Sequence, residues 1–168
     1  MPDNSRVLYW DSSVFLSWVN EIPSRVSIIE DIHTEITEGN NSIVYTSVES
    51  IVEVANADIE KQQQRLDPAV EERITNMWED ISFIKVVDNI PHIAEIARRL
   101  MRDTIPQGWV LKPKDAIHLA TAMWLDKNVD RIDELHTYDT GLPKYEAMIG
   151  IPICEPHVLQ ARMKGFNV

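Results

Sequence analysis

The chain has 168 residues, of which 44% are apolar and 26% charged, values that predict one soluble globular domain over residues 1–168. Its 27 acids outnumber its 16 bases, and the net charge of −11 argues against a non-specific nucleic-acid coat. The single cysteine, Cys154, excludes an internal disulfide and a CxxC zinc site, and we interpret it as an inert core thiol. No signal peptide or transmembrane run is evident, so we expect a cytoplasmic protein with no membrane partner.

The hydrophobic pattern predicts strands that alternate with helices along the chain. This alternation is typical of an α/β fold with a mostly parallel sheet. A polar segment, 58–66, either extends the helix before it or forms an arm. The expected strands are 7–10, 43–45, 83–87, 135–138 and 151–154. The expected helices are 14–20 and those that begin at 23, 46, 68, 91 and 113. The helix that begins at 68 is expected to run to about residue 80.

Acidic side chains gather where these strands end. Asp11 directly follows the first strand and Asp139 the fourth, while Asp115 lies in the first turn of the helix that begins at 113. Taken singly, each has an ordinary structural explanation: an aspartate after a strand is a common turn residue, and an acid in the first turn of a helix is favoured by the helix dipole. In an open α/β sheet, however, the binding crevice lies outside the carboxyl ends of the strands. Glu49 and Glu53, on the helix after the second strand, would bring a fourth segment to the same place.

A capping argument separates these two glutamates. Thr46 and Glu49 have the spacing of a capping box, in which each side chain bonds the backbone N–H of the other residue. Glu49 therefore has a structural role available, whereas Glu53 has none. A bound cation would relieve the repulsion between two acids spaced four residues apart on a helix. Glu53 is therefore the better candidate for a site residue.

Converging carboxylates repel one another unless a cation lies between them. The sequence contains no cysteine ligand set and no evident histidine cluster, so the expected cation is Mg²⁺ or Mn²⁺, which prefer oxygen ligands. Such metals generate a hydroxide nucleophile and stabilise phosphoryl oxygens. The chemistry indicated is metal-assisted hydrolysis of phosphodiesters.

Basic residues lie close to Asp115 in the sequence. They form either a phosphate-binding patch or two ordinary solvated helix faces. His118, one turn after Asp115, would either contact a substrate phosphate or be a half-buried histidine. Trp109 is the best candidate for stacking on a base. The candidate substrate-binding residues of this region are Arg102, Lys112, Lys114 and His118.

Four motifs, in order, resemble those of the PIN-domain nucleases, and among them the VapC-type toxins. Residues 11–14 (DSSV) resemble the first acidic motif, and residues 47–54 (SVESIVEV) resemble the strand-to-helix motif whose last glutamate falls on Glu53. Residues 115–122 (DAIHLATA) are similar to the third acidic motif and are the most specific stretch. Residues 137–139 (TYD) match the motif that ends the fourth strand, so the resemblance spans nearly the whole chain.

The resemblance implies a three-layer α/β/α sandwich with four or five strands. It also implies an endoribonuclease that needs Mg²⁺ or Mn²⁺. The implied partners are an RNA substrate, an antitoxin protein if the chain is the toxin of a pair, and a second copy in a homodimer. Carried over by motif, the catalytic and metal-binding acids are Asp11, Glu53, Asp115 and Asp139, with the hydroxyls of Thr137 and Ser12 positioning water, metal ligands or substrate.

Two other functions stay open at this point. A PIN-like module would bind RNA or protein without cutting, and metal binding would then not depend on the acids. A phosphatase would use Asp11 as a covalent nucleophile. Enzymes of that type carry a second aspartate two residues later, where this chain has Ser13, so we rank it last.

Overall fold

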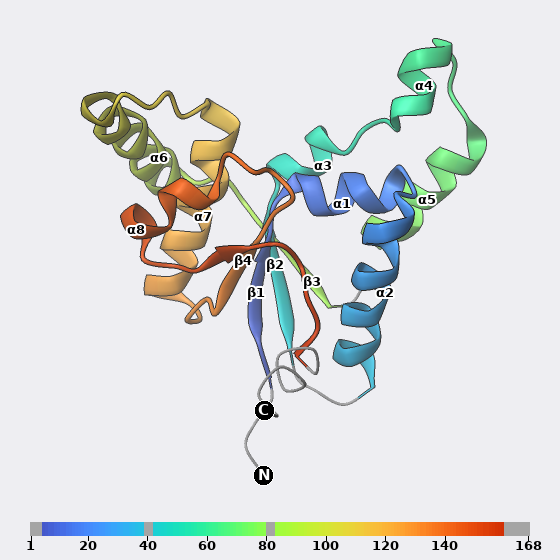
Figure 1. Ribbon diagram of the computed structural model, residues 1–168, viewed down its shortest axis with the longest axis horizontal. Coiled ribbons are helices and arrows are strands. Elements are labelled where there is room, and N and C mark those ends of the chain that lie inside the picture. Colours follow the sequence, from blue (N-terminus) through green and yellow to red (C-terminus); the bar gives the residue numbers. More distant parts are fainter. Residues whose placement is uncertain (1–4, 39–41, 80–82, 160–168) are drawn as a thin grey trace, which may run out of the picture.

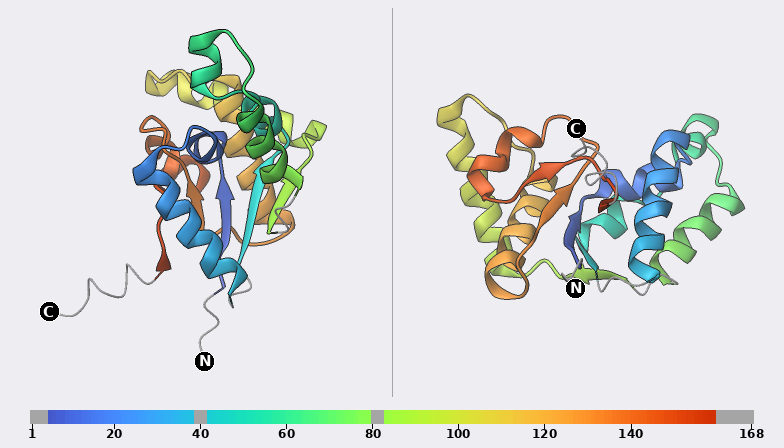
Figure 2. Two further views of the ribbon diagram at one scale, coloured as in Figure 1. Left: turned by 90° about the vertical axis from the view of Figure 1, so that its right-hand side faces the viewer. Right: turned by 60° about the horizontal axis from the view of Figure 1, so that its bottom comes forward.

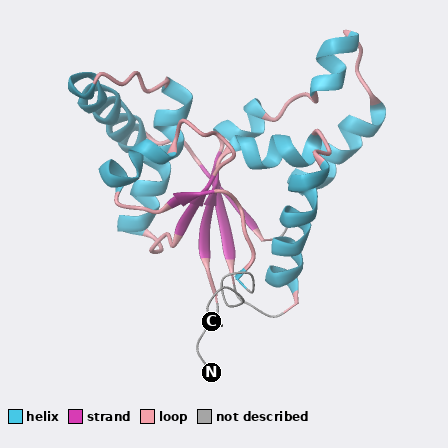
Figure 3. Ribbon diagram, viewed as in Figure 1, coloured by secondary structure: helices cyan, strands magenta, loops and turns pink. Residues whose placement is uncertain are grey.

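The computed structural model describes residues 5–38, 42–79 and 83–159. Its five strands form one sheet in the order β3-β2-β1-β4-β5, and every neighbouring pair is parallel (Figure 3). The predicted α/β fold is therefore confirmed, with a sheet that is parallel throughout. The strands are β1 (Val7–Trp10), β2 (Ile43–Ser47), β3 (Ile84–Val87), β4 (Glu134–His136) and β5 (Ile153–Cys154).

Helices cover both faces of this sheet. Helices α6, α7 and α8 lie on one face and α1, α2 and α5 on the other, which gives three layers (Figure 1). Proline opens α2, α6 and α7, where its missing N–H leaves no helix bond unmade. The helices are α1 (Ser12–Val19), α2 (Pro23–Thr37), α3 (Glu49–Glu53), α4 (Asp58–Gln63), α5 (Pro68–Glu79), α6 (Pro91–Thr104), α7 (Pro113–Asn128) and α8 (Glu146–Ile149), with 3₁₀ turns at Ile105–Gln107 and Pro143–Tyr145.

The core consists of two apolar clusters, one on each face of the sheet. Successive strand residues point to opposite faces, so Leu8 and Trp10 pack against the α1–α2 side while Tyr9 packs against α7. All three side chains are fully buried. Among the described residues, no helix is both long and apolar enough to cross a bilayer.

Helix α4 stands away from the rest of the molecule, at the end of an extended connection (Figures 1 and 2). Of the two alternatives for residues 58–66, the structure shows the arm and not a continuation of α3. Glu60 anchors its base, because its carboxylate accepts hydrogen bonds from the backbone N–H groups of Ala57 (3.1 Å) and Asp67 (2.8 Å).

The helix predicted to begin at Thr46 is wrong in its start. Strand β2 continues through Ser47, so α3 is short, and Ile51 and Val52 are 43% and 72% exposed. The expected capping box is also absent. The Thr46 hydroxyl is buried and donates to the carbonyl of Trp10 (2.7 Å), an interaction across strands that a local sequence motif does not reveal. The predicted helix over 68 to about 80 ends at Glu79, and Asp80 lies outside the described residues.

We expect Thr46→Val to lower the free energy of unfolding by about 1–2 kcal/mol. The variant keeps the shape of the side chain but leaves the Trp10 carbonyl, and the Ser50 hydroxyl 2.7 Å from Thr46 Oγ1, without this partner. Urea unfolding measures the change as a lower midpoint at constant slope. Thr34→Val is the matched control, because that exposed hydroxyl bonds only its own helix, and a change beyond about 0.5 kcal/mol is not expected there. Equal stability of the two variants would contradict the prediction.

Candidate active site

Asp11 lies at the point where β1 ends and α1 begins. It is 4% exposed and caps the helix, because its Oδ1 accepts the backbone N–H of Ser13 (3.0 Å) and the Ser13 hydroxyl (2.5 Å). Its Oδ2 accepts the hydroxyl of Thr137 at 2.5 Å. Burial raises the pKa of Asp11, while the charge of His118 and these hydrogen bonds oppose that rise. The carboxylate is thus buried and oriented by donors from two segments.

Thr137 connects Asp11 to Asp139 just beyond β4. Its Oγ1 donates to Asp11 and accepts the backbone N–H of Asp139 at 2.9 Å. Asp139 is exposed, and its Oδ1 accepts the backbone N–H of Gly141 at 2.7 Å. A side chain at Gly141 would meet that same Oδ1 at 3.1 Å, which is closer than ordinary contact, so a glycine suits this turn. The threonine in the TYD motif therefore fixes the spacing of two acids.

Glu53, at the end of α3, is held by partners from its own chain. Its Oε2 accepts the Nε2–H of His118 at 2.7 Å, and its Oε1 lies 3.0 Å from the ammonium of Lys114. Burial alone would raise the pKa of Glu53. The hydrogen bond and charge of His118, with hydrogen bonds from Lys114 and Ser12, instead lower it to about 2. Glu53 is therefore ionised at neutral pH and closely paired.

Asp115, in the first turn of α7, is half-buried among other acids. Burial and then the negative charge of Asp139 raise its pKa, and Glu53 adds to the rise, whereas His118 and Lys112 lower it. Mutual repulsion of this kind requires the carboxylates to lie near one another. The structure thus brings the four predicted acids to one edge of the sheet, from the segments after β1, β2 and β4 and from the start of α7.

The predicted substrate-binding residues do not all lie in the same surroundings. His118 is 2% exposed and lies between Glu53 and Tyr9, so it supports a carboxylate inside the protein. Lys112 and Lys114 are exposed beside Asp115, as a phosphate contact requires. Arg102 is exposed in the last turn of α6, and no contact with the acids is found for it in the described ranges.

Two residues of the site were not predicted from the sequence. Tyr9 places its hydroxyl 2.8 Å from His118 Nδ1, at the opposite end of the imidazole from Glu53. Ser13 bonds Asp11 and also accepts the backbone N–H of Tyr138 at 2.9 Å. The position of Ser13 two residues after a helix-capping aspartate was a usable signal for it. The Tyr9 contact joins residues 109 apart in sequence and has no local signal.

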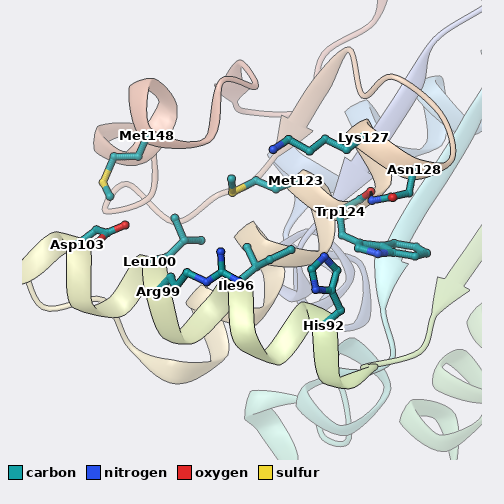
Figure 4. Close-up of a pocket in the computed structure, with 10 residues that line it drawn as sticks. All are labelled: His92, Ile96, Arg99, Leu100, Asp103, Met123, Trp124, Lys127, Asn128 and Met148. Atoms are coloured by element: carbon teal, nitrogen blue, oxygen red, sulfur yellow. Dashed lines mark hydrogen bonds between the residues drawn. The ribbon is translucent and has the colours of Figure 1, made fainter.

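A hollow of about 420 Å³ lies away from these acids, between α6, α7 and α8 (Figure 4). None of the four acids lines it. Arg99 and Lys127 face it together with Asp103, over a floor that includes Met123 and Leu100. Trp124 lies at its rim and is partly buried.

Comparison with profiles of known protein families identifies the family of this chain. The profile of the PIN domain family matches residues 8–147, which include every acid described above. A profile match over most of a chain assigns its family. The chain therefore belongs to the PIN-domain family, whose members are typically nucleases.

Solved structures of similar fold come from bacterial VapBC systems. A chain of VapBC2 from Rickettsia felis, crystallised on a DNA fragment of its promoter, matches with a TM-score of 0.61 and 10% identity over 88% of this chain and 96% of that chain. A chain of VapBC-1 from nontypeable Haemophilus influenzae matches with a TM-score of 0.60 and 13% identity, over 89% of this chain and 97% of that chain. VapC20 of Mycobacterium tuberculosis is a toxin that cleaves the sarcin-ricin loop. It matches with a TM-score of 0.54 and 13% identity, over 79% of this chain and 90% of that chain. The comparison with curated proteins found no match.

Proposed function

We propose that this protein is an endoribonuclease that needs Mg²⁺ or Mn²⁺ and hydrolyses phosphodiester bonds of RNA. The observation that carries the proposal is the position of Asp11 and Asp139, joined by Thr137 at the carboxyl edge of the sheet, with Asp115 close enough to Asp139 for their charges to repel. The family assignment supports it, since PIN domains are typically nucleases.

The side chains present fit a hard divalent cation. The donor set consists of carboxylate oxygens, which Mg²⁺ and Mn²⁺ prefer. The raised pKa values of Asp11 and Asp115 reflect buried negative charge that a cation would offset. The residues that would hold the metal are Asp11, Asp115 and Asp139, with Glu53 beside them. When bound, such a metal stabilises charge on phosphate oxygens and helps to ionise water.

The chain's own residues then have separable tasks. Thr137 and Ser13 fix the orientation of the Asp11 carboxylate through hydroxyl hydrogen bonds. His118, backed by Tyr9, keeps Glu53 ionised and turned toward the site. Lys112 and Lys114 place exposed positive charge next to the acids, where they would attract the backbone of a single RNA strand.

The toxin role is part of the same proposal. Two of the similar structures are VapBC toxin–antitoxin complexes, and a third is a toxin that cleaves the sarcin-ricin loop. We therefore propose an antitoxin protein as the partner of this chain and a homodimer as its assembly. A co-expressed neighbouring gene product that abolishes RNA cleavage by this protein would be that antitoxin.

A binding module that does not cut RNA is the second candidate. The observation in its favour is the pairing of both Glu53 oxygens with His118 and Lys114, which leaves this carboxylate occupied. Lys114 is 67% exposed, however, and a lysine so placed is free to move toward a phosphate. Cleavage assays separate the two candidates directly.

The test is cleavage of a mixed RNA pool by the purified full chain. We expect fragments to form with Mg²⁺ or Mn²⁺, to disappear when EDTA is added, and to be absent with Asp11→Asn, which removes one acidic charge from the site. The variant purified in parallel reports any contaminating ribonuclease. Equal cleavage by both proteins, or cleavage by neither, would contradict the proposed function, and in the second case retained RNA binding would favour the binding module.

A further inference from the structure

A second group of ligand-type side chains lies on the sheet, separate from the acids. Glu134, His136, Cys154 and His157 each offer one donor atom, and these atoms all lie within 4.8 Å of one another. Two short patterns supply them, Glu-x-His in β4 and a Cys-x-x-His that begins at the last residue of β5. Neither pattern alone predicted a metal site.

Strand geometry explains why the four side chains meet. Glu134 and His136 are two residues apart in β4 and therefore point to the same face of the sheet. Cys154 is the register partner of His136 in the parallel pairing of β4 with β5, so it shares that face. The chain then turns, and the backbone carbonyl of His157 accepts Arg6 Nη2 at 3.0 Å.

The spacing of the donor atoms already suits a small metal ion. His157 Nε2 lies 3.2 Å from Glu134 Oε2, and the Cys154 sulfur lies within 4.8 Å of a donor atom of each of these residues. Two nitrogen or oxygen ligands of one tetrahedral Zn²⁺ ion are about 3.3 Å apart. Only small side-chain rotations would bring the three residues onto one ion.

Hydrogen bonds decide which nitrogens are available. His157 Nδ1 lies 3.1 Å from the carbonyl of Glu155, so Nδ1 carries the proton and the lone pair is on Nε2. That Nε2 is buried and faces Glu134 Oε2 at 3.2 Å. In His136 the proton is on the other nitrogen. The Trp10 indole donates to Nδ1 (3.1 Å), so Nε2 carries the proton and points it at Glu134 Oε2 (3.0 Å).

These protonation patterns give the residues different roles. Glu134, Cys154 and His157 are ligands, whereas His136 is a positioning residue that orients the carboxylate, as outer partners of metal ligands do. The carboxylates of Glu134 and Glu35 and the Cys154 thiolate carry three negative charges, which Arg6 and a divalent ion would balance.

We propose that Glu134, Cys154 and His157 form a second metal site, for a transition-metal ion of the Zn²⁺ class. Thiolate and imidazole select such metals against Mg²⁺ and Mn²⁺. The fourth position is open to water, because the His157 side chain is 24% exposed and Cys154 is half-buried, which corrects its interpretation as a core thiol. Binding ties the segment after β5 to β4 and releases the thiol proton.

Cobalt titration of the full chain tests the site. With excess Mg²⁺ present to occupy the acids, one equivalent of Co²⁺ should give a near-ultraviolet thiolate-to-metal absorption that Zn²⁺ then abolishes. Cys154 is the only cysteine, so this band has a single possible source. We expect Cys154→Ser to remove the band and His157→Gln to weaken Co²⁺ binding at least about tenfold. No band in the wild type, or unchanged affinity in His157→Gln, would overturn the proposal.

Asp115→Asn is the matched control, because it alters the acid cluster and should leave the band unchanged. Loss of the band in Asp115→Asn would place the bound cobalt elsewhere and would also overturn the proposal. Circular dichroism of each variant shows that it is folded before the titration is read. The readout is absorption, so the result is independent of whether the chain cuts RNA.

Discussion

Asp115→Asn should slow RNA cleavage by roughly a thousandfold and abolish thermal stabilisation by Mg²⁺. In the wild type, we expect Mg²⁺ at about 100 times its dissociation constant to add about 2.7 kcal/mol to the free energy of unfolding and to raise Tm by about 5–10 °C. Asp115 supplies much of the negative charge that makes binding favourable, since Asp139 and Glu53 already raise its pKa. Differential scanning calorimetry with and without Mg²⁺ measures the second effect independently of any RNA substrate.

Without metal, the same variant should be no less stable than the wild type. The carboxylate of Asp115 is disfavoured by burial and by its acidic neighbours, so a neutral amide removes repulsion. Asp31→Asn is the matched control, because it changes the same charge at an exposed position of α2. A variant that kept its Mg²⁺-dependent rise in Tm would show that Asp115 is not a ligand.

His118→Leu should lower the free energy of unfolding by about 3 kcal/mol at pH 7. The change removes the donor to Glu53 Oε2 and leaves the buried Tyr9 hydroxyl without this partner. His118→Gln is the conservative comparison, because its amide is able to donate to Glu53 without a charge, and it should recover part of the loss. Urea unfolding at pH 7 measures both. Leu and Gln variants of equal stability would mean that the Glu53 hydrogen bond contributes little.

The pH dependence provides a second readout of the same pair. The pKa of Glu53 is about 2 in the folded chain against an ordinary 4.5, so the folded state binds fewer protons between these values. Its stabilisation is therefore complete above about pH 4.5 and is lost as the pH falls toward 2. His118→Leu moves the pKa of Glu53 back toward its ordinary value, so the variant should lose less stability than the wild type across that window. Parallel acid-unfolding curves would contradict this assignment.

Much of the fold was predictable because its signals are local. Apolar runs predicted all five strands, and proline and periodicity predicted the starts of α2, α5, α6 and α7. The start of α3 was not predicted, because the Thr46 hydroxyl bonds a neighbouring strand instead of its own helix. The preference for Glu53 over Glu49 therefore rested on a capping box that does not form. Glu53 nevertheless lies at the site, because His118 and Lys114 of α7 hold its carboxylate there.

Local patterns in the sequence identify the residues that end the strands, and parallel strands bring such ends to one edge of a sheet. This is why Asp11 and Asp139 were predicted as neighbours from their positions alone. Which side chains pair depends on tertiary packing. His118 bonds both Tyr9 and Glu53, and His136 lies beside Cys154, because the order and register of the strands place them there. Periodic patterns report the face on which a residue lies, whereas contacts between distant residues depend on how whole elements pack.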